Sequence, residues 1–231
     1  METLRYNAFT YIHKALRALL YDAALTIQQT DFTDPAGSAL AVKKIEQVLE
    51  QFESHAAHED RHIIPAVMKY DPGLASEIDS EHEKDEMLTL RLENKITKFL
   101  KADSPTDLHR TGLQVMYCFI DFVAFNLTHM NKEESMINKV LWENYTDEEL
   151  MDISKAIRTE IPPQEMMLTL RLMLKGISNA EIVALFNDMK ANAPAPAYEA
   201  VRQMAILELP SYRWHQVSRD TEEATLLQQA V

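Results

Sequence analysis

The stretch HAAHEDRH (residues 55–62) puts three histidines and three charged residues within eight positions. The segment around it, residues 38–69, has apolar residues at alternating steps of three and four, which is the pattern of an amphipathic helix. His55 and Glu59 lie one helical turn apart on the apolar stripe, and the stripe continues through His62 and Ala66. His62 fits either a role beside the site or that of a hydrogen-bonded core histidine. The pattern therefore predicts a helix whose inner face carries titratable side chains.

Three further segments have the same kind of stripe: residues 4–29, 74–101 and 105–143. The last stripe runs through Glu133 to Met136 and Val140, which we therefore expect inside. Loops with proline, glycine and capping residues separate them, and the whole chain has only four glycines. Long helices joined by short loops form an up-down-up-down four-helix bundle, so we expect an all-α fold of this kind with additional helices after it. Pro65 should kink or end the second helix just after its titratable groups.

Polar residues interrupt the apolar stripe of every predicted helix. The first helix contributes one histidine, and each of the other three contributes a His-x-x-x-Glu pair, with Asp85 as the alternative to Glu86 on the third. Imidazoles and carboxylates in a dry core cost several kcal/mol each unless they are paired or bind a metal. We therefore predict a metal site whose ligands are His13, His55, Glu59, His82, Glu86, His129 and Glu133.

The donor types indicate which metals fit this predicted site. Three carboxylates favour more than one divalent cation, since one carboxylate can bridge two ions. Mixed histidine and carboxylate donors suit iron or manganese, and the absence of thiolate donors argues against a structural zinc site. The ferritin-type bundle uses two Glu-x-x-His pairs, but this chain has one, Glu59 with His62. We expect two iron ions, with manganese or zinc as possible substitutes.

The sequence resembles the hemerythrin-like, or HHE cation-binding, domain over about residues 4–145. The motifs that carry the resemblance are YIHKALRALL, HAAHED, SEHEKDE and HMNKEESM, which contain the predicted ligands. The resemblance implies a non-haem di-iron centre. His13 and His55 would bind one iron and His82, Glu86 and His129 the other. Glu59 and Glu133 would bridge the two irons beside an oxo or hydroxo group.

Two positions depart from the oxygen-carrying hemerythrins. Those proteins have a second histidine where Glu86 stands, and they bridge with an aspartate one residue beyond Glu133, where this chain has Glu134. On stripe geometry Glu133 is the bridging residue here. A carboxylate in place of an imidazole adds negative charge and should favour ferric iron, which weakens reversible oxygen carriage.

These features predict a di-iron protein that binds or reacts with oxygen, peroxide or nitric oxide, in sensing or in protection from stress. Two alternatives remain open. One is a di-iron enzyme of the peroxidase or nitric-oxide-reductase kind, and the other is an iron store or a donor for the repair of iron centres. The partner would then be a small diatomic ligand or peroxide.

Composition argues against nucleic acid and membranes as partners, and it indicates the cellular compartment. The net charge is −13 and no basic stripe occurs, so we expect no nucleic-acid partner and no anionic membrane surface. The longest apolar run, MYCFIDFVAFNL, is too short to span a bilayer, and the first residues lack the apolar stretch of a signal peptide. The single cysteine, Cys118, fits a reducing compartment, so we expect a cytoplasmic protein.

The last third of the sequence contains no cluster of potential metal ligands. We therefore divide the chain into a metal-binding bundle, residues 1–145, and a helical extension, residues 146–231. Ser178 and Glu181 predict a capping box at the start of one of its helices. The apolar face around Met166–Leu174 predicts either packing on the bundle, which we favour, or the contact of a homodimer.

Overall fold

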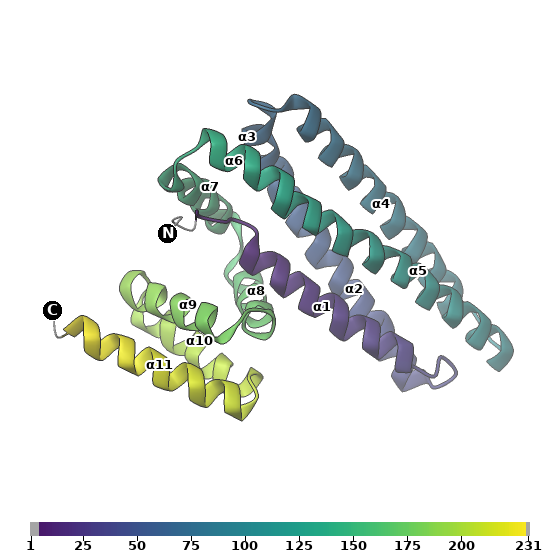
Figure 1. The fold of residues 1–231 in the computed structure, drawn as a ribbon. Helices are drawn as coiled ribbons and strands as arrows, with labels where there is room; N and C mark the ends of the chain where they lie inside the picture. Colours follow the sequence, from purple (N-terminus) through teal and green to yellow (C-terminus); the bar gives the residue numbers. More distant parts are fainter. Residues whose placement is uncertain (1–4, 230–231) are drawn as a thin grey trace. The chain divides into compact units, whose positions relative to one another are not determined.

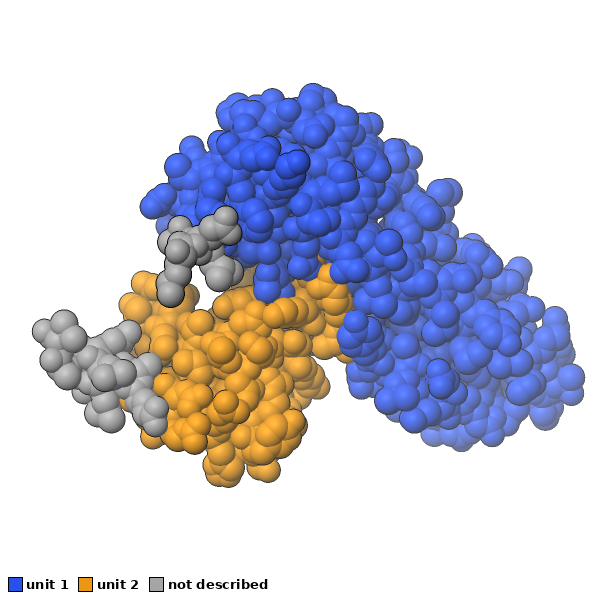
Figure 2. Space-filling view, viewed as in Figure 1, with its two compact units in different colours: residues 1–10, 19–160 blue, residues 11–18, 161–231 orange. Residues whose placement is uncertain are grey.

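The computed structural model describes residues 5–229, with side chains up to residue 222. Within this range the chain is helical and contains no strand, which confirms the predicted all-α class. It divides into two compact units, shown in two colours in Figure 2. The first comprises residues up to 10 and 19–160, and the second comprises residues 11–18 and those from 161 onward.

The four predicted bundle helices are present. They are α1 (Thr10–Gln29), α2 (Pro35–His58), α4 (Pro72–Leu100) and α5 (Pro105–Lys132), and they lie side by side with alternating directions (Figure 1). The segment Tyr11–Ala18 of α1 is grouped with the second unit, although the helix is continuous. The predicted up-down-up-down arrangement is therefore confirmed.

Local sequence sets where these helices begin. Three of them start with proline, and each proline follows a capping residue whose side chain accepts a hydrogen bond from a backbone N–H of the first turn. The caps are Asp34 for α2, Asp71 for α4 and Ser104 for α5. Proline at this position loses no helical hydrogen bond, because the first N–H groups have no partner within the helix. These sharp starts keep the connecting loops short and the helices antiparallel.

Two of the bundle helices widen into a single π-helical turn. After α2 the turn η1 (Glu59–Ile63) leads into α3 (Ile64–Met68), and after α5 the turn η2 (Glu133–Ile137) leads into α6 (Asn138–Asn144). In η1 the N–H of Ile64 bonds to the carbonyl of Glu59, five residues earlier. Pro65, which has no N–H, follows directly, so the predicted disturbance takes the form of this wide turn.

The π turns shift the inner face by one residue. Beyond Glu59 the buried side chains are Ile63 and Val67, and beyond Glu133 they are Ile137 and Leu141, all at most 2 % exposed. A regular helix would have buried the four residues one position earlier, as the sequence pattern predicted: His62, Ala66, Met136 and Val140. That prediction was wrong for Met136, which is 42 % exposed, because the extra residue in each wide turn rotates everything after it.

Helix α7 (Asp147–Glu160) belongs to the first unit. Its Leu150 is buried among Ile63, Ile137 and Leu141, and Ile153 and Ile157 pack against the same cluster. This packing explains why the compact unit extends past residue 145, where the sequence analysis placed the boundary, to residue 160.

The second unit has a core of its own. Its helices are α8 (Pro163–Gly176), α9 (Asn179–Asn192), α10 (Ala195–Glu208) and α11 (Ser211–Gln229). Leu174, Ile182, Phe186 and Val201 are at most 1 % exposed and belong to one apolar cluster. The predicted capping box between Ser178 and Glu181 is present at the start of α9. What this unit contacts in the cell stays a prediction.

Across the described residues, every helix is too short or too polar to cross a lipid bilayer.

The register set by the π turn can be tested with two neighbouring residues. Ile137→Ala removes a fully buried side chain and should lower the free energy of unfolding by about 2–5 kcal/mol. Met136→Ala, on the exposed side, should change it by no more than about 0.5 kcal/mol. Denaturant unfolding of both variants provides the measurement. The reverse order of destabilisation would show that the helix runs regularly through Glu133.

Candidate metal centre

The polar residues of the four helices converge at one level of the bundle. In both α2 and α5 a histidine, His55 or His129, stands one turn before a glutamate that begins a π turn, Glu59 or Glu133. His82 projects from the middle of α4. Because the wide turns begin at the two glutamates, their side chains still follow the regular helix, while the backbone after them changes register.

Four of these residues form a buried group in the first unit. One ligand atom each from Glu59, His82, His129 and Glu133 lies within 4.8 Å of the other three. Nε2 of His129 is 3.1 Å from Oε1 of Glu133. Nε2 of His82 is 3.6 Å from that oxygen and 3.7 Å from Oε2 of Glu59. All four side chains are at most 8 % exposed, so their charges are withdrawn from water.

A second group overlaps the first. It consists of His13, His55, Glu59 and Glu133, again with ligand atoms within 4.8 Å of one another. His13 on α1 is fully buried, and Nε2 of His55 is 3.2 Å from Oε1 of Glu59. The two groups share both glutamates. The structure thus brings together six of the seven predicted ligands in two overlapping sets of four.

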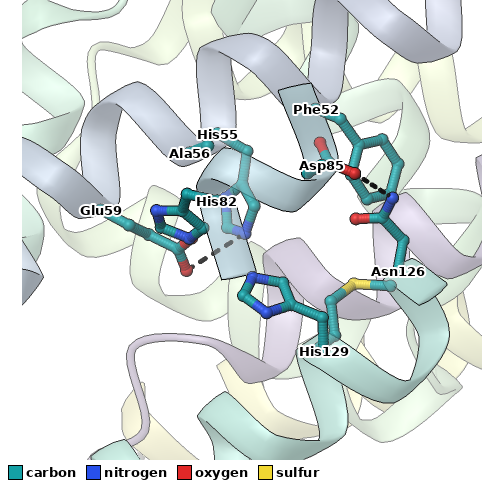
Figure 3. Close-up of a pocket in the computed structure, with 9 residues that line it drawn as sticks. Phe52, His55, Ala56, Glu59, His82, Asp85, Asn126 and His129 are labelled. Atoms are coloured by element: carbon teal, nitrogen blue, oxygen red, sulfur yellow. Dashed lines mark hydrogen bonds and ion pairs between the residues drawn. The ribbon is translucent and has the colours of Figure 1, made fainter. Parts of the chain in front are cut away.

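Glu86 is the predicted ligand that the structure leaves out. Its side chain is exposed on α4, and Asp85, the alternative from the sequence, lines the pocket instead. Oδ1 of Asp85 accepts a hydrogen bond of 2.6 Å from Nδ2 of Asn126, which is itself buried. Burial raises the pKa of Asp85, and this hydrogen bond opposes the shift. On α4 it is therefore Asp85 (Figure 3), and not Glu86, whose side chain faces the site.

Carboxylates outside the group orient two of the histidines. Nδ1 of His82 is 2.7 Å from Oδ1 of Asp60, and Nδ1 of His129 is 2.8 Å from Oε2 of Glu81. An acid that holds Nδ1–H leaves the Nε2 lone pair for a metal, and such partners are typical of metal-bound histidine. Neither acid was predicted from the sequence. Each lies on a different helix from its histidine, so spacing along one helix carries no signal of them.

A lysine extends one of these contacts to the surface. Nζ of Lys132 lies 2.6 Å from Oε1 of Glu81 and 2.6 Å from Oε1 of Glu77. Burial would raise the pKa of Glu81, but its hydrogen bonds to His129 and Lys132 lower it below its ordinary value. The Glu81 carboxylate is therefore kept charged while it holds the imidazole of His129.

In the metal-free protein the carboxylates also govern histidine protonation. Burial lowers the pKa of His82, but the neighbouring carboxylates of Glu133, Glu59 and Asp60 raise it to about 9. The pKa of His129 is raised as well, since Glu133 and Glu81 outweigh burial. Protons therefore partly neutralise the buried acids, a task that a cation would perform more fully.

His62, which the sequence left open between a role at the site and a core role, does not join either group. Its Nε2 is 3.2 Å from Oε2 of Glu160 at the end of α7, and the same oxygen pairs with Nη1 of Arg61 at 2.6 Å. These contacts tie the π turn after α2 to α7, so His62 has a structural role.

The arrangement fits a pair of cations. Each set of four offers two imidazole nitrogens and two carboxylates, and the shared carboxylates each have a second oxygen with which to bind a second ion. Such donor sets hold divalent and trivalent transition metals in helical bundles.

Comparison with protein families gives a match to the profile described as "Hemerythrin HHE cation binding domain" over residues 5–141. Comparisons with curated proteins and with solved structures give no significant match.

The outer carboxylate of His129 should matter for metal binding. Glu81→Ala removes the acceptor of Nδ1–H and should weaken the binding of Fe²⁺ by about 10–100-fold, measured by competition with a chelator. Glu83→Ala, an exposed glutamate two positions further along the same helix, serves as the matched control and should leave the affinity unchanged. Equal affinities in the two variants would show that Glu81 does not position the ligand.

Metal binding should also release protons. A histidine must be neutral to bind a metal, and His82 in the metal-free protein is protonated below its pKa of about 9. At pH 7 the binding of Fe²⁺ should therefore release at least one proton per chain, and affinity should rise with pH up to about 9. Anaerobic calorimetry in two buffers of different ionisation enthalpy counts the protons. Identical heats in the two buffers would contradict the assignment of His82 as a ligand.

Proposed function

Because this chain belongs to the hemerythrin HHE cation-binding domain family, we propose that it holds two iron ions and binds or reacts with oxygen, peroxide or nitric oxide, in sensing or in protection from stress. The observation that carries the proposal is that two sets of candidate ligands share Glu59 and Glu133. Two carboxylates common to two sites are what a pair of bridged ions needs, whereas a mononuclear site needs only one set of four.

The donor chemistry supports iron. The only cysteine, Cys118, is buried on α5 outside both groups, so no thiolate from this chain favours zinc there. Two imidazoles and two carboxylates per ion are donors that iron accepts in both oxidation states, with the carboxylates favouring the ferric one. Bound iron would supply electrons for redox reaction and coordination positions for a small ligand.

The chain's own residues prepare that chemistry. Asp60 and Glu81 hold the Nδ1 atoms of His82 and His129, so that Nε2 of each ring faces the carboxylates. The ring of Phe125 stacks on that of His129 with centroids 5.7 Å apart and fixes its plane. On one side of the site, Phe52 and Phe122 meet edge to face between α2 and α5, which keeps that part of the bundle dry.

The test is metal analysis of protein purified without added metal, with optical spectra before and after exposure to air, peroxide and nitric oxide. We expect two irons per chain and a charge-transfer band that changes in proportion to the added oxidant. Continuous consumption of peroxide would favour the enzyme alternative, and rapid transfer of iron to a chelator would favour the storage alternative. At most one iron per chain would contradict the dinuclear site.

Variants identify the residues responsible. Glu59→Ala and His82→Ala should each lower both the iron content and the melting temperature, since each removes a ligand and leaves other buried charges uncompensated. Glu86→Ala, an exposed glutamate one turn beyond His82, is the matched control and should keep both values. The ligand assignment fails if Glu59→Ala and His82→Ala change neither quantity, or if Glu86→Ala changes them equally.

A further inference from the structure

None of the residues in the segment Tyr11–Ala18 of α1 is exposed, whereas Tyr21 and Leu25, further along the same helix, are each 57 % exposed. The segment groups with the second unit, where α8 and α9 contact it. It also carries His13, the candidate ligand that α1 contributes. The residues that fix this segment are therefore able to fix the position of a metal ligand.

The end of α8 lies directly against the backbone of this segment. Gly176 is the last residue of α8, and a methyl group added to it would stand 2.3 Å from the carbonyl oxygen of Lys14 and 2.9 Å from the backbone nitrogen of Ala15. Both distances are well inside van der Waals contact, so only glycine lets α8 come this close. The peptide group that Gly176 contacts, between Lys14 and Ala15, is one residue beyond His13.

An ion pair joins the same segment to the start of α9. Nζ of Lys14 lies 2.6 Å from Oε1 of Glu181, whose side chain is 21 % exposed. The other carboxylate oxygen of Glu181 accepts the N–H of Ser178 at 2.7 Å in the capping box, so the same side chain is anchored to the helix start. Tyr11 packs on the apolar cluster of the second unit that contains Ile182. The segment is thus held through its backbone, through a charge and through an aromatic ring.

We propose that the C-terminal helices position His13 for metal binding, through the contact of Gly176 with the α1 backbone and the ion pair of Glu181 with Lys14. The inference rests on the proposed function and gives the second unit a role in it. Gly176 and Glu181 belong to neither ligand group, so they act through α1 as positioning residues.

The two metal positions should depend on these contacts to different degrees. His13 belongs only to the group that includes His55, whereas the group of His82 and His129 takes its ligands from η1, α4, α5 and η2, all in the first unit. A ligand held about 1 Å too loosely no longer binds its ion well. Loosening the α1 segment should therefore weaken the His13/His55 position first, while a general loss of stability would weaken both positions.

The experiment is anaerobic titration of the metal-free, full-length protein with Fe²⁺ in competition with a chelator, which gives a dissociation constant for each of the two binding steps. Gly176→Ala should weaken one of the two steps by about 10–100-fold, the usual effect of losing a residue that orients a metal ligand. Gly73→Ala is the matched control. A methyl group there would meet only the side chain of Asp71, at 3.4 Å, and both dissociation constants should stay as in the parent protein.

A second pair of variants tests the ion pair, and it decides the question if Gly176→Ala does not fold. Glu181→Gln removes the charge that holds Lys14 and should weaken the same binding step severalfold. Glu208→Gln is the matched control, because the Glu208 side chain is also 21 % exposed and pairs with Lys175 at 2.9 Å, but this pair joins α10 to α8. Each variant loses an ion pair of the second unit, and only Glu181→Gln should change the affinity for Fe²⁺.

The His13→Ala background separates positioning from general stability. With the imidazole removed, Gly176→Ala should change the remaining Fe²⁺ affinity by less than about twofold, because the group that it positions is absent. Equal weakening with and without His13 would overturn the inference, as would parent-like affinities in both Gly176→Ala and Glu181→Gln, or an equal loss in Glu208→Gln. A parent protein that binds at most one Fe²⁺ would contradict the proposed function and this inference with it.

Discussion

The structure depends on gathering carboxylates and imidazoles inside a helical bundle. Glu59 and Glu133 are at most 3 % exposed, and His13, His82 and His129 at most 7 %, at one level of the core. The free energy needed to bury so many charged groups exceeds the net stability of a small folded unit, unless groups of opposite charge lie among them. Protons on the histidines, with the raised pKa of His82, supply part of that charge in the metal-free protein. Two cations held by the shared glutamates would supply the rest.

The rest of the first unit can be understood as support for that cluster. Capped helix starts and short loops bring candidate ligands from all four bundle helices to the same depth. The π turns begin at the two shared glutamates, so that the helices can return to apolar packing on a new register immediately afterwards. Outer carboxylates, Asp60 and Glu81, lie on helices adjacent to the histidines they hold. The site is thus assembled across helices, because a carboxylate from one segment orients a candidate ligand on another.

Periodicity along the sequence was sufficient to predict the bundle and most of the cluster. The stripes predicted four helices. Five of the six residues that the structure brings together came from the His-x-x-x-Glu spacing, and the sixth, His13, from its place on the first stripe. The same periodicity failed after Glu59 and Glu133, because a regular 3.6-residue repeat does not include a π turn, and Met136 was placed inside as a result. Periodicity also could not decide whether Asp85 or Glu86 faces the site, because the two residues are neighbours and a small rotation of α4 exchanges them. Contacts between helices, such as those of Asp60 and Glu81, leave no pattern within one segment.

If the chain holds two metal ions, Glu59 and Glu133 are shared between them. Diffraction from crystals of the iron-loaded protein, collected on both sides of the iron absorption edge, would locate the ions. We expect two anomalous peaks, both within bonding distance of the two glutamates, one beside His13 and His55 and the other beside His82 and His129. A single peak, or peaks that do not lie between the two glutamates, would contradict it.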